Sequence, residues 1–152
     1  MATFAPGNQD DLISVIIRGH RAAEQAFLEL ASGHGTPQHR RDLADRVTTE
    51  LTRHSAAKAL YLYPSARKLL PDGDQLADDD LAGHAELERS LENLAGVEAT
   101  NPAFAGLLGT VIAAARHHID EEEQQLLPRL QQACDDDELL ALGRRFTARN
   151  HS

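Results

Sequence analysis

The chain has 152 residues, which is enough for one domain with a sizeable buried core. Its 15 basic and 24 acidic side chains give a net charge of −9, which argues against a nucleic-acid partner because such a partner needs a basic surface. The sequence contains one cysteine and no apolar run near the roughly 20 residues of a membrane span, and its start does not resemble a signal peptide, so we expect a cytoplasmic protein without a membrane partner.

The spacing of hydrophobic residues is helical throughout, and no segment shows the alternation of a β-strand. The first predicted helix spans about residues 8–32 and ends at Gly33, a typical helix stop. The second spans about 38–70, after Thr36 and Pro37, which are typical of a helix start. Pro64 lies inside this second helix and should kink it, because proline cannot donate a backbone hydrogen bond.

The third predicted helix spans about 74–95 and the fourth about 101–134, with a second kink expected at Pro128. A short final helix should run from about 135 to 149. Because the connections between the long helices are short, neighbouring helices should be antiparallel. The sequence therefore predicts an all-α fold: an up-down-up-down four-helix bundle plus a short C-terminal helix, forming one domain over residues 8–150.

An internal repeat of 64 residues is centred on histidines, since His20 and His84 are 64 residues apart, and so are His54 and His118. Each of the four lies at or beside the middle of its predicted helix. Helix centres lie at one depth in an antiparallel bundle, so the four imidazoles should meet at one level of the core. The repeat makes each half of the chain a helical hairpin, with the two hairpins related by a pseudo-two-fold axis.

Acidic side chains accompany these histidines at helical spacing. A glutamate stands four residues after three of them, and residues four apart on a helix share nearly the same face. These glutamates are Glu24, Glu88 and Glu122, whereas Lys58 takes the corresponding position after His54. Imidazole and carboxylate ligands suit iron, manganese or zinc rather than calcium or a thiolate centre. Buried imidazoles without metal are the alternative, but grouping four of them without a compensating partner is costly.

These residues resemble those of the bacterial hemerythrin-like family, the HHE cation-binding domains, from about residue 10 to 134. The strongest similarity lies in the segments 50–64 and 116–130. The resemblance implies a non-haem iron centre, normally with two irons, that interacts with oxygen, peroxide or nitric oxide. It also implies that the metal ligands are His20, His54, His84, His118 and Glu122, with Glu88 at a position that is a ligand in only some members.

Lys58 departs from the family pattern, because a bridging glutamate is expected there. In one interpretation the site still holds two irons while Lys58 turns away and Glu24, Glu50 or Glu88 helps instead. In the other, the centre is weakened, holds one metal or is empty. Tyr61, seven residues after His54, is a core residue, a hydrogen-bond donor near the metal ligands, or a phenolate ligand that replaces the missing carboxylate.

Three functions remain open from the sequence. The first is an iron protein that binds or consumes a small oxidant, which includes a peroxide- or nitric-oxide-consuming enzyme active in oxidative stress. The second is an iron or oxygen sensor, or a metal buffer, without turnover. The third is a scaffold whose metal site has decayed at Lys58. The sequence does not select among them, and it does not predict an oligomeric state.

Overall fold

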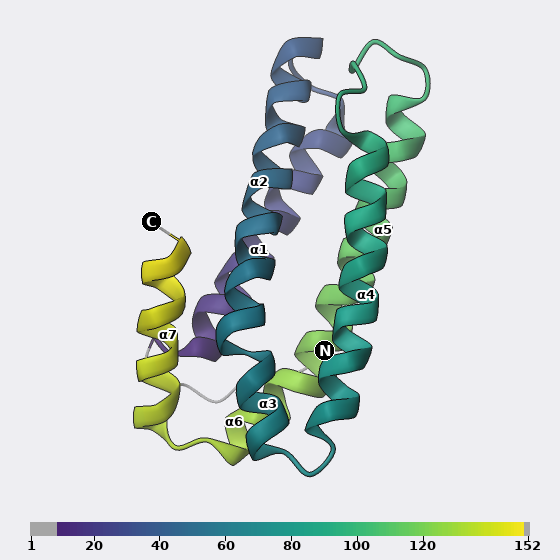
Figure 1. Ribbon diagram of the computed structural model, residues 1–152. Coiled ribbons are helices and arrows are strands. Elements are labelled where there is room, and N and C mark those ends of the chain that lie inside the picture. The colour runs from purple at the N-terminus through teal and green to yellow at the C-terminus, as the bar shows by residue number, and fades with distance from the viewer. Residues whose placement is uncertain (1–8, 151–152) are drawn as a thin grey trace.

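The structure is a computed structural model that describes residues 9–150, and all regular elements in this range are helices (Figure 1). The predicted first helix begins at residue 8, outside the described range, whereas the observed one begins at Leu12. Seven α-helices and one π-helical turn follow one another along the described part of the chain: α1 Leu12–Ser32, α2 Pro37–Tyr61, α3 Tyr63–Leu69, α4 Gly73–Leu94, α5 Phe104–Glu121, η1 Glu122–Leu126, α6 Leu127–Ala133 and α7 Asp136–Asn150.

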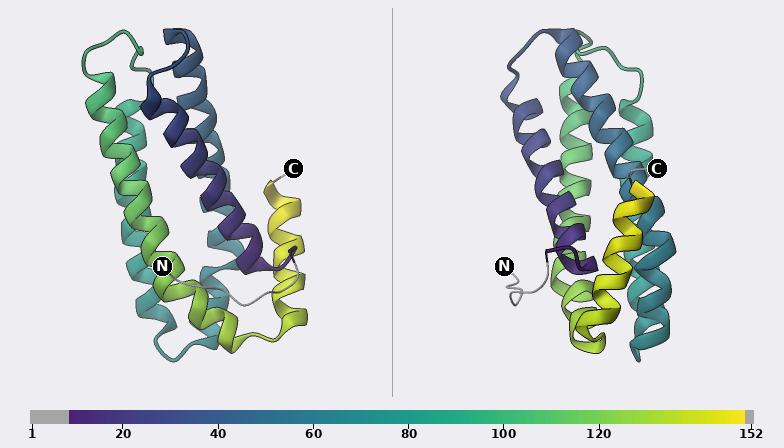
Figure 2. Two further views of the ribbon diagram at one scale, coloured as in Figure 1. Left: turned by 180° about the vertical axis from the view of Figure 1, so that it is seen from behind. Right: turned by 90° about the vertical axis from the view of Figure 1, so that its left-hand side faces the viewer.

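The long helices form two antiparallel hairpins that pack side by side. Helices α1 and α2 form the first hairpin, and α4 and α5 form the second (Figures 1 and 2). Helix α3 extends the line of α2, η1 and α6 extend that of α5, and α7 packs outside the bundle against α1 and α2. The predicted up-down-up-down bundle with an additional C-terminal helix is therefore confirmed. No helix in the described range is long and apolar enough to cross a lipid bilayer.

Local sequence signals account for the helix ends. The Asp11 side chain accepts a hydrogen bond of 2.7 Å from the backbone N–H of Ser14 at the start of α1. Thr36 caps α2 in the same way, accepting from the N–H of His39 at 3.1 Å. Gly33 ends α1 with a φ of 73°, a left-handed conformation that glycine adopts without steric cost.

Both prolines within long helices coincide with an irregularity, as predicted. Pro64 is the second residue of α3, and the regular α-helix is interrupted at Leu62. Pro128 is the second residue of α6 and follows the π-helical turn η1. Proline removes one backbone donor and crowds the preceding turn, which makes the wider π-helical turn favourable there. Such turns are frequent at functional sites, and η1 begins at Glu122.

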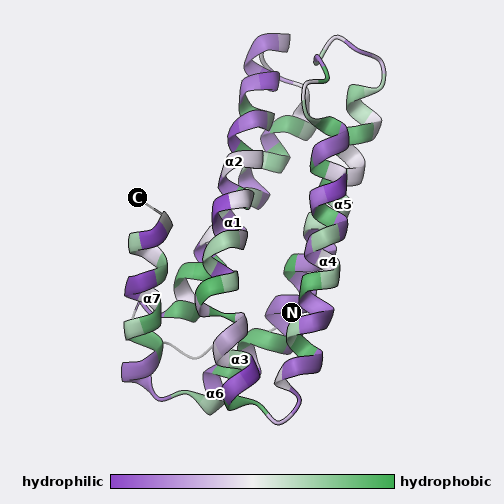
Figure 3. Ribbon diagram, viewed as in Figure 1, coloured by the Kyte–Doolittle hydropathy of each residue, from purple (hydrophilic) through white to green (hydrophobic). Residues whose placement is uncertain are grey.

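Apolar residues gather in two clusters at opposite ends of the bundle. One cluster includes Phe27 and Phe104 and lies between the ends of the long helices near the α1–α2 connection. The other includes Leu62, Leu127 and Phe146 and joins α3, α6 and α7 to the start of α1. Helices α1, α4 and α5 each carry both hydrophobic and hydrophilic residues, as amphipathic bundle helices require, whereas much of α2 is hydrophilic (Figure 3). The four repeat histidines belong to neither cluster, so a polar layer separates the two apolar ends.

Candidate metal centre

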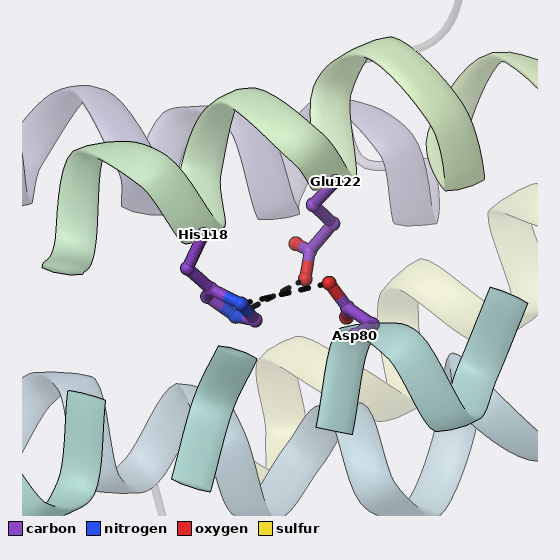
Figure 4. Close-up of side chains that lie close together, drawn as sticks. All are labelled: Asp80, His118 and Glu122. Atoms are coloured by element: carbon purple, nitrogen blue, oxygen red, sulfur yellow. Dashed lines mark ion pairs between the residues drawn. The ribbon is translucent and has the colours of Figure 1, made fainter. Parts of the chain in front are cut away.

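Three buried side chains from two helices converge in this polar layer. His118 and Glu122 project from one side toward Asp80 on α4 (Figure 4). His118 Nε2 is 3.5 Å from one Glu122 oxygen, and His118 Nδ1 is 3.6 Å from Asp80 Oδ1. One ligand atom from each residue lies within 4.8 Å of the others. Ligands at about 2.0–2.2 Å from a transition metal lie no more than about 4.4 Å apart, so these atoms need little movement to bind one.

The three side chains fit a cation because their polar atoms are poorly satisfied without one. Among the described residues, neither Glu122 oxygen, nor His118 Nδ1, nor Asp80 Oδ2 has a hydrogen bond of ordinary geometry. Glu122 is fully buried, while Asp80 and His118 are each 4% exposed. Buried polar groups in proteins are normally paired, so several unpaired ones in one cluster indicate a place for a ligand. Two carboxylates and an imidazole are donors that suit iron, manganese or zinc.

The charges of the cluster are also adapted to a cation. Burial, followed by the negative charge and hydrogen bond of Glu122, raises the pKa of Asp80 to about 9. Burial opposes ionisation of Glu122, but the Lys58 charge and a hydrogen bond from His20 keep its pKa well below the ordinary value. Burial and the Glu122 charge therefore favour a protonated Asp80, and a cation bound beside it would compete with that proton. Burial lowers the pKa of His118 to about 4, which leaves the imidazole neutral, as a metal ligand must be.

Lys58 points into the site and contacts Glu122 from the opposite side. Its Nζ is 2.8 Å from Glu122 Oε1 and 3.3 Å from His20 Nε2, and the residue is only 4% exposed. The sequence-based alternative in which Lys58 turns away is therefore not the arrangement observed. An ion pair with a fully buried carboxylate holds the lysine inward, because an uncompensated charge would be costly there.

His20 is enclosed by two consecutive glutamates. Its Nε2 is 3.0 Å from Glu122 Oε1, and its Nδ1 is 2.6 Å from Glu123 Oε2. Arg21 pairs with the other Glu123 oxygen. Consecutive residues of an α-helix point about 100° apart, and the two nitrogens of an imidazole face in different directions. One ring can therefore contact both carboxylates. Glu123 was missed from the sequence because it lies five rather than four residues after His118.

His84 lies beside the cluster, with its ring 5.9 Å from that of His118. Its Nδ1 is 3.1 Å from the Ser55 hydroxyl, and its Nε2 is 3.1 Å from a Glu88 oxygen. The predicted pair of His84 and Glu88 therefore exists, but the Glu88 side chain is 57% exposed and faces the edge of the site. Both nitrogens of His84 thus contact protein groups, so the ring lies beside the cluster without being one of its three members.

His54 lies on the α7 side of the centre. Its ring packs edge-on against Phe146 at a centroid distance of 5.7 Å and closely against Gly19. Burial, followed by the nearby Lys58 charge, lowers the pKa of His54 to about 4. The sequence grouped His54 with the other three histidines, and the structure places it near Lys58 and His20 rather than beside Asp80.

The other residues proposed from the sequence lie farther from the cluster. Glu24 pairs with Arg21 in a partly exposed position, and exposed Glu50 approaches Arg53 at 3.5 Å. Tyr61 is partly buried against the apolar cluster at the α3 end. The tyrosine at the site is instead Tyr63, whose phenol hydrogen-bonds with Asp80. Burial raises the pKa of this phenol.

A cavity of about 230 Å³ lies within the bundle against the same centre. Its polar wall includes His20, His54, Lys58 and His118, and most of its remaining wall consists of alanine, leucine, valine and isoleucine side chains of α1, α2, α4 and α5. A water molecule needs only about 10–15 Å³ of such space. The cavity therefore has ample room for a small molecule next to His118, and its apolar lining suits a weakly polar one.

Comparisons with known proteins identify the family and the fold. The family model of the hemerythrin HHE cation-binding domain matches residues 11–130. A crystal structure of a hemerythrin HHE cation-binding domain-containing protein from Mycobacterium kansasii superposes with a TM-score of 0.81 at 20% sequence identity. The alignment covers 93% of this chain and 85% of that one. At this identity the superposition establishes the shared fold alone. No functionally curated protein matches significantly.

Proposed function

We propose a function from the premise that this chain belongs to the hemerythrin HHE cation-binding domain family, as the match over residues 11–130 shows. Metal binding follows from the family and from the buried donor cluster. We infer further that the metal is iron and that the protein binds or reacts with oxygen, peroxide or nitric oxide. The sequence predicts two irons, with one as the alternative.

One observation carries this proposal: the buried cluster of Asp80, His118 and Glu122, several of whose polar atoms lack a hydrogen bond of ordinary geometry, adjoins a largely apolar cavity. Three protein ligands leave further coordination positions free on a transition metal. His118 belongs both to the cluster and to the cavity wall, so a molecule in the cavity lies next to those positions. An apolar cavity favours oxygen and nitric oxide over charged metabolites.

Iron, when bound, supplies a Lewis-acidic and redox-active position for a small oxidant. The residues of this chain do the rest. Asp80 and Glu122 offer negative charge, His118 offers a neutral imidazole, and Tyr63 orients Asp80 through its hydrogen bond. The apolar walls limit water near the metal, which favours reversible binding of a diatomic molecule over side reactions.

The direct test is anaerobic loading with ferrous iron, followed by separate exposure to oxygen, hydrogen peroxide and nitric oxide while the absorption spectrum is recorded. We expect new near-ultraviolet or visible bands with at least one of the three. Bands that reverse when the gas is removed indicate a carrier or sensor, and catalytic oxygen release from peroxide indicates an enzyme. Protein that takes up iron but responds to none of them is a metal buffer, and protein that takes up none has a decayed site.

Glu122→Gln is the matched control for that experiment, since it keeps the shape of the side chain and removes the charge. The proposal predicts loss of both iron uptake and the spectral response in this variant. An equal response in the wild type and Glu122→Gln would place the iron elsewhere and contradict the proposal.

A further inference from the structure

We propose that the centre holds a single metal ion, in the half built from Asp80, His118 and Glu122, and that the Lys58 ammonium permanently replaces a second ion. This inference rests on the metal binding proposed above and concerns the number and place of the metals. It differs from the two-iron prediction, and the two halves of the internal repeat carry the argument.

One half of the repeat, the hairpin of α1 and α2, lacks the acidic side chains of the other, and we call it the degenerate half. A shift of 64 residues pairs each residue around the cluster with a counterpart in the other hairpin: Asp80 with Ile16, His84 with His20, His118 with His54, and Glu122 with Lys58. One half thus has two carboxylates and two imidazoles, of which His118 has a nitrogen without a hydrogen bond and His84 contacts Ser55 and the exposed Glu88. The other keeps both imidazoles but replaces the carboxylates with a fully buried isoleucine and an ammonium, neither of which can bind a cation.

The repeat is also present in three dimensions, which makes this comparison valid. Gly83 of α4 lies against the His118 ring, where a Cβ would come within 3.3 Å of Nδ1. Gly19 of α1, one repeat earlier in the sequence, lies against the His54 ring so closely that a Cβ would collide with it. Each histidine therefore packs on the glycine of its own hairpin. The two halves share this packing, and they differ in the side chains available for a metal and in the π-helical turn that begins at Glu122.

Lys58 occupies the place where a second cation would bind Glu122. Its ammonium contacts Glu122 Oε1 at 2.8 Å, while the other Glu122 oxygen faces His118 at 3.5 Å. The carboxylate therefore bridges an ammonium on one side and the open metal position on the other. A divalent ion in the degenerate half would have to share an oxygen with Lys58 and would be repelled by its charge.

His20 is withdrawn from metal binding by the same network. His20 Nε2 lies 3.0 Å from Glu122 Oε1 and 3.3 Å from Lys58 Nζ. His20 Nδ1 lies 2.6 Å from Glu123 Oε2, and Arg21 pairs with the other Glu123 oxygen. Both ring nitrogens are thus engaged by the protein. In the degenerate half, only His54 lacks a polar partner of this kind among the described contacts.

The arrangement has a functional consequence. A single ion would have no neighbouring ion with which to share electrons or bridge a ligand, so a small ligand would bind to one metal only. The fixed charge of Lys58 also neutralises part of Glu122, and a positive charge near the metal favours a negatively charged ligand such as a reduced oxygen species. Lys58 is therefore a positioning residue toward the metal, since it acts there through Glu122, although its side chain also lines the cavity.

Metal analysis of the full chain tests this inference, with cobalt(II) and ferrous iron as probes under anaerobic conditions. We expect one ion per chain in the wild type, one in His54→Gln and none in His118→Gln. Oxidised iron protein should show the paramagnetic resonance signal of an isolated high-spin ferric ion, which a coupled pair would not give. Two ions per chain in the wild type, or loss of the ion in His54→Gln, would overturn the inference but leave metal binding intact. No metal in the wild type would instead contradict the proposed function, and this inference with it.

Substitutions at position 58 provide the gain-of-function arm. Lys58→Glu combined with Ile16→Asp restores the missing ligands and should raise the content toward two ions per chain, with loss of the isolated ferric signal. Lys58→Met is the matched control, because it removes the ammonium without adding a donor, and it should stay at one. A content of two in Lys58→Met would show that the ammonium merely blocked an intact site, and the inference that the degenerate half lacks ligands would be wrong.

Discussion

Replacing Lys58 with methionine should destabilise the metal-free protein far more than the metal-bound protein. Methionine has a similar length, so the substitution removes the charge with little change in packing. It leaves the fully buried Glu122 carboxylate without the partner that lies 2.8 Å from it. Breaking a buried ion pair on one side costs about 3–5 kcal/mol. For a domain of this size, that corresponds to a fall in melting temperature of roughly 6–20 °C.

A bound metal should reduce this penalty, since the ion neutralises Glu122 from its other oxygen. The assay is urea unfolding of Lys58→Met and wild type, each with and without metal, with Lys68→Met as the control. Lys68 is exposed, and its substitution should change the free energy of unfolding by no more than about 0.5 kcal/mol. A loss at Lys58 below about 1 kcal/mol without metal, or an equal loss in both states, would refute the interpretation of Lys58 as a substitute cation.

Three further predictions concern the surroundings of the centre. Gly83→Ala should weaken metal binding about tenfold or more, because the added Cβ displaces His118. Gly19→Ala should displace His54 and leave metal affinity nearly unchanged. Titration of both variants with cobalt(II) measures the two affinities. Because His54 has a pKa of about 4 when folded and 6.5 when unfolded, the unfolded state binds more protons between these values. The metal-free protein should therefore lose stability, by up to about 2 kcal/mol, as pH falls from 6.5 to 4, and His54→Gln should flatten this slope in thermal unfolding. Phe146→Ala should cost about 3–5 kcal/mol in denaturant unfolding, because its fully buried ring anchors α7 on the bundle; a loss below about 1 kcal/mol would contradict that role.

The fold was predictable because its signals are local. Helical spacing of apolar residues, the glycine stop at Gly33 and the cap at Thr36 each depend on a few neighbouring residues, and all are found in the structure. The irregularities at Pro64 and Pro128 follow from the missing proline donor. The second irregularity is a π-helical turn that begins at Glu122, a member of the metal cluster. This feature depends on tertiary packing, so the spacing of residues could not predict it.

The candidate site was predictable only in part. The repeat identified His118 and Glu122, but it carries no signal for Asp80, whose counterpart one repeat earlier is Ile16. Asp80 stands four residues before His84, as Glu50 stands before His54, so helical spacing alone could have identified it. The inward ion pair of Lys58 was not predictable, because the direction of a long side chain depends on which charges the other helices bring near it.

Tyr63 shows a different limit of the sequence. Helical spacing from His54 favoured Tyr61, but the interruption at Leu62 changes the direction of the residues that follow. Tyr63 is consequently buried beside Asp80 while Tyr61 packs at the edge of an apolar cluster. The interruption follows from Pro64, whose kink was predicted from the sequence. Helical spacing counted from His54 therefore does not predict which residues beyond the kink face the site.

Anomalous diffraction from crystals of the metal-loaded protein tests the central claim most directly, because it locates each ion. We predict one peak per chain, bounded by Asp80, His118 and Glu122, with the Lys58 ammonium still in contact with Glu122. Two peaks, or a single peak between His20 and His54, would contradict the account.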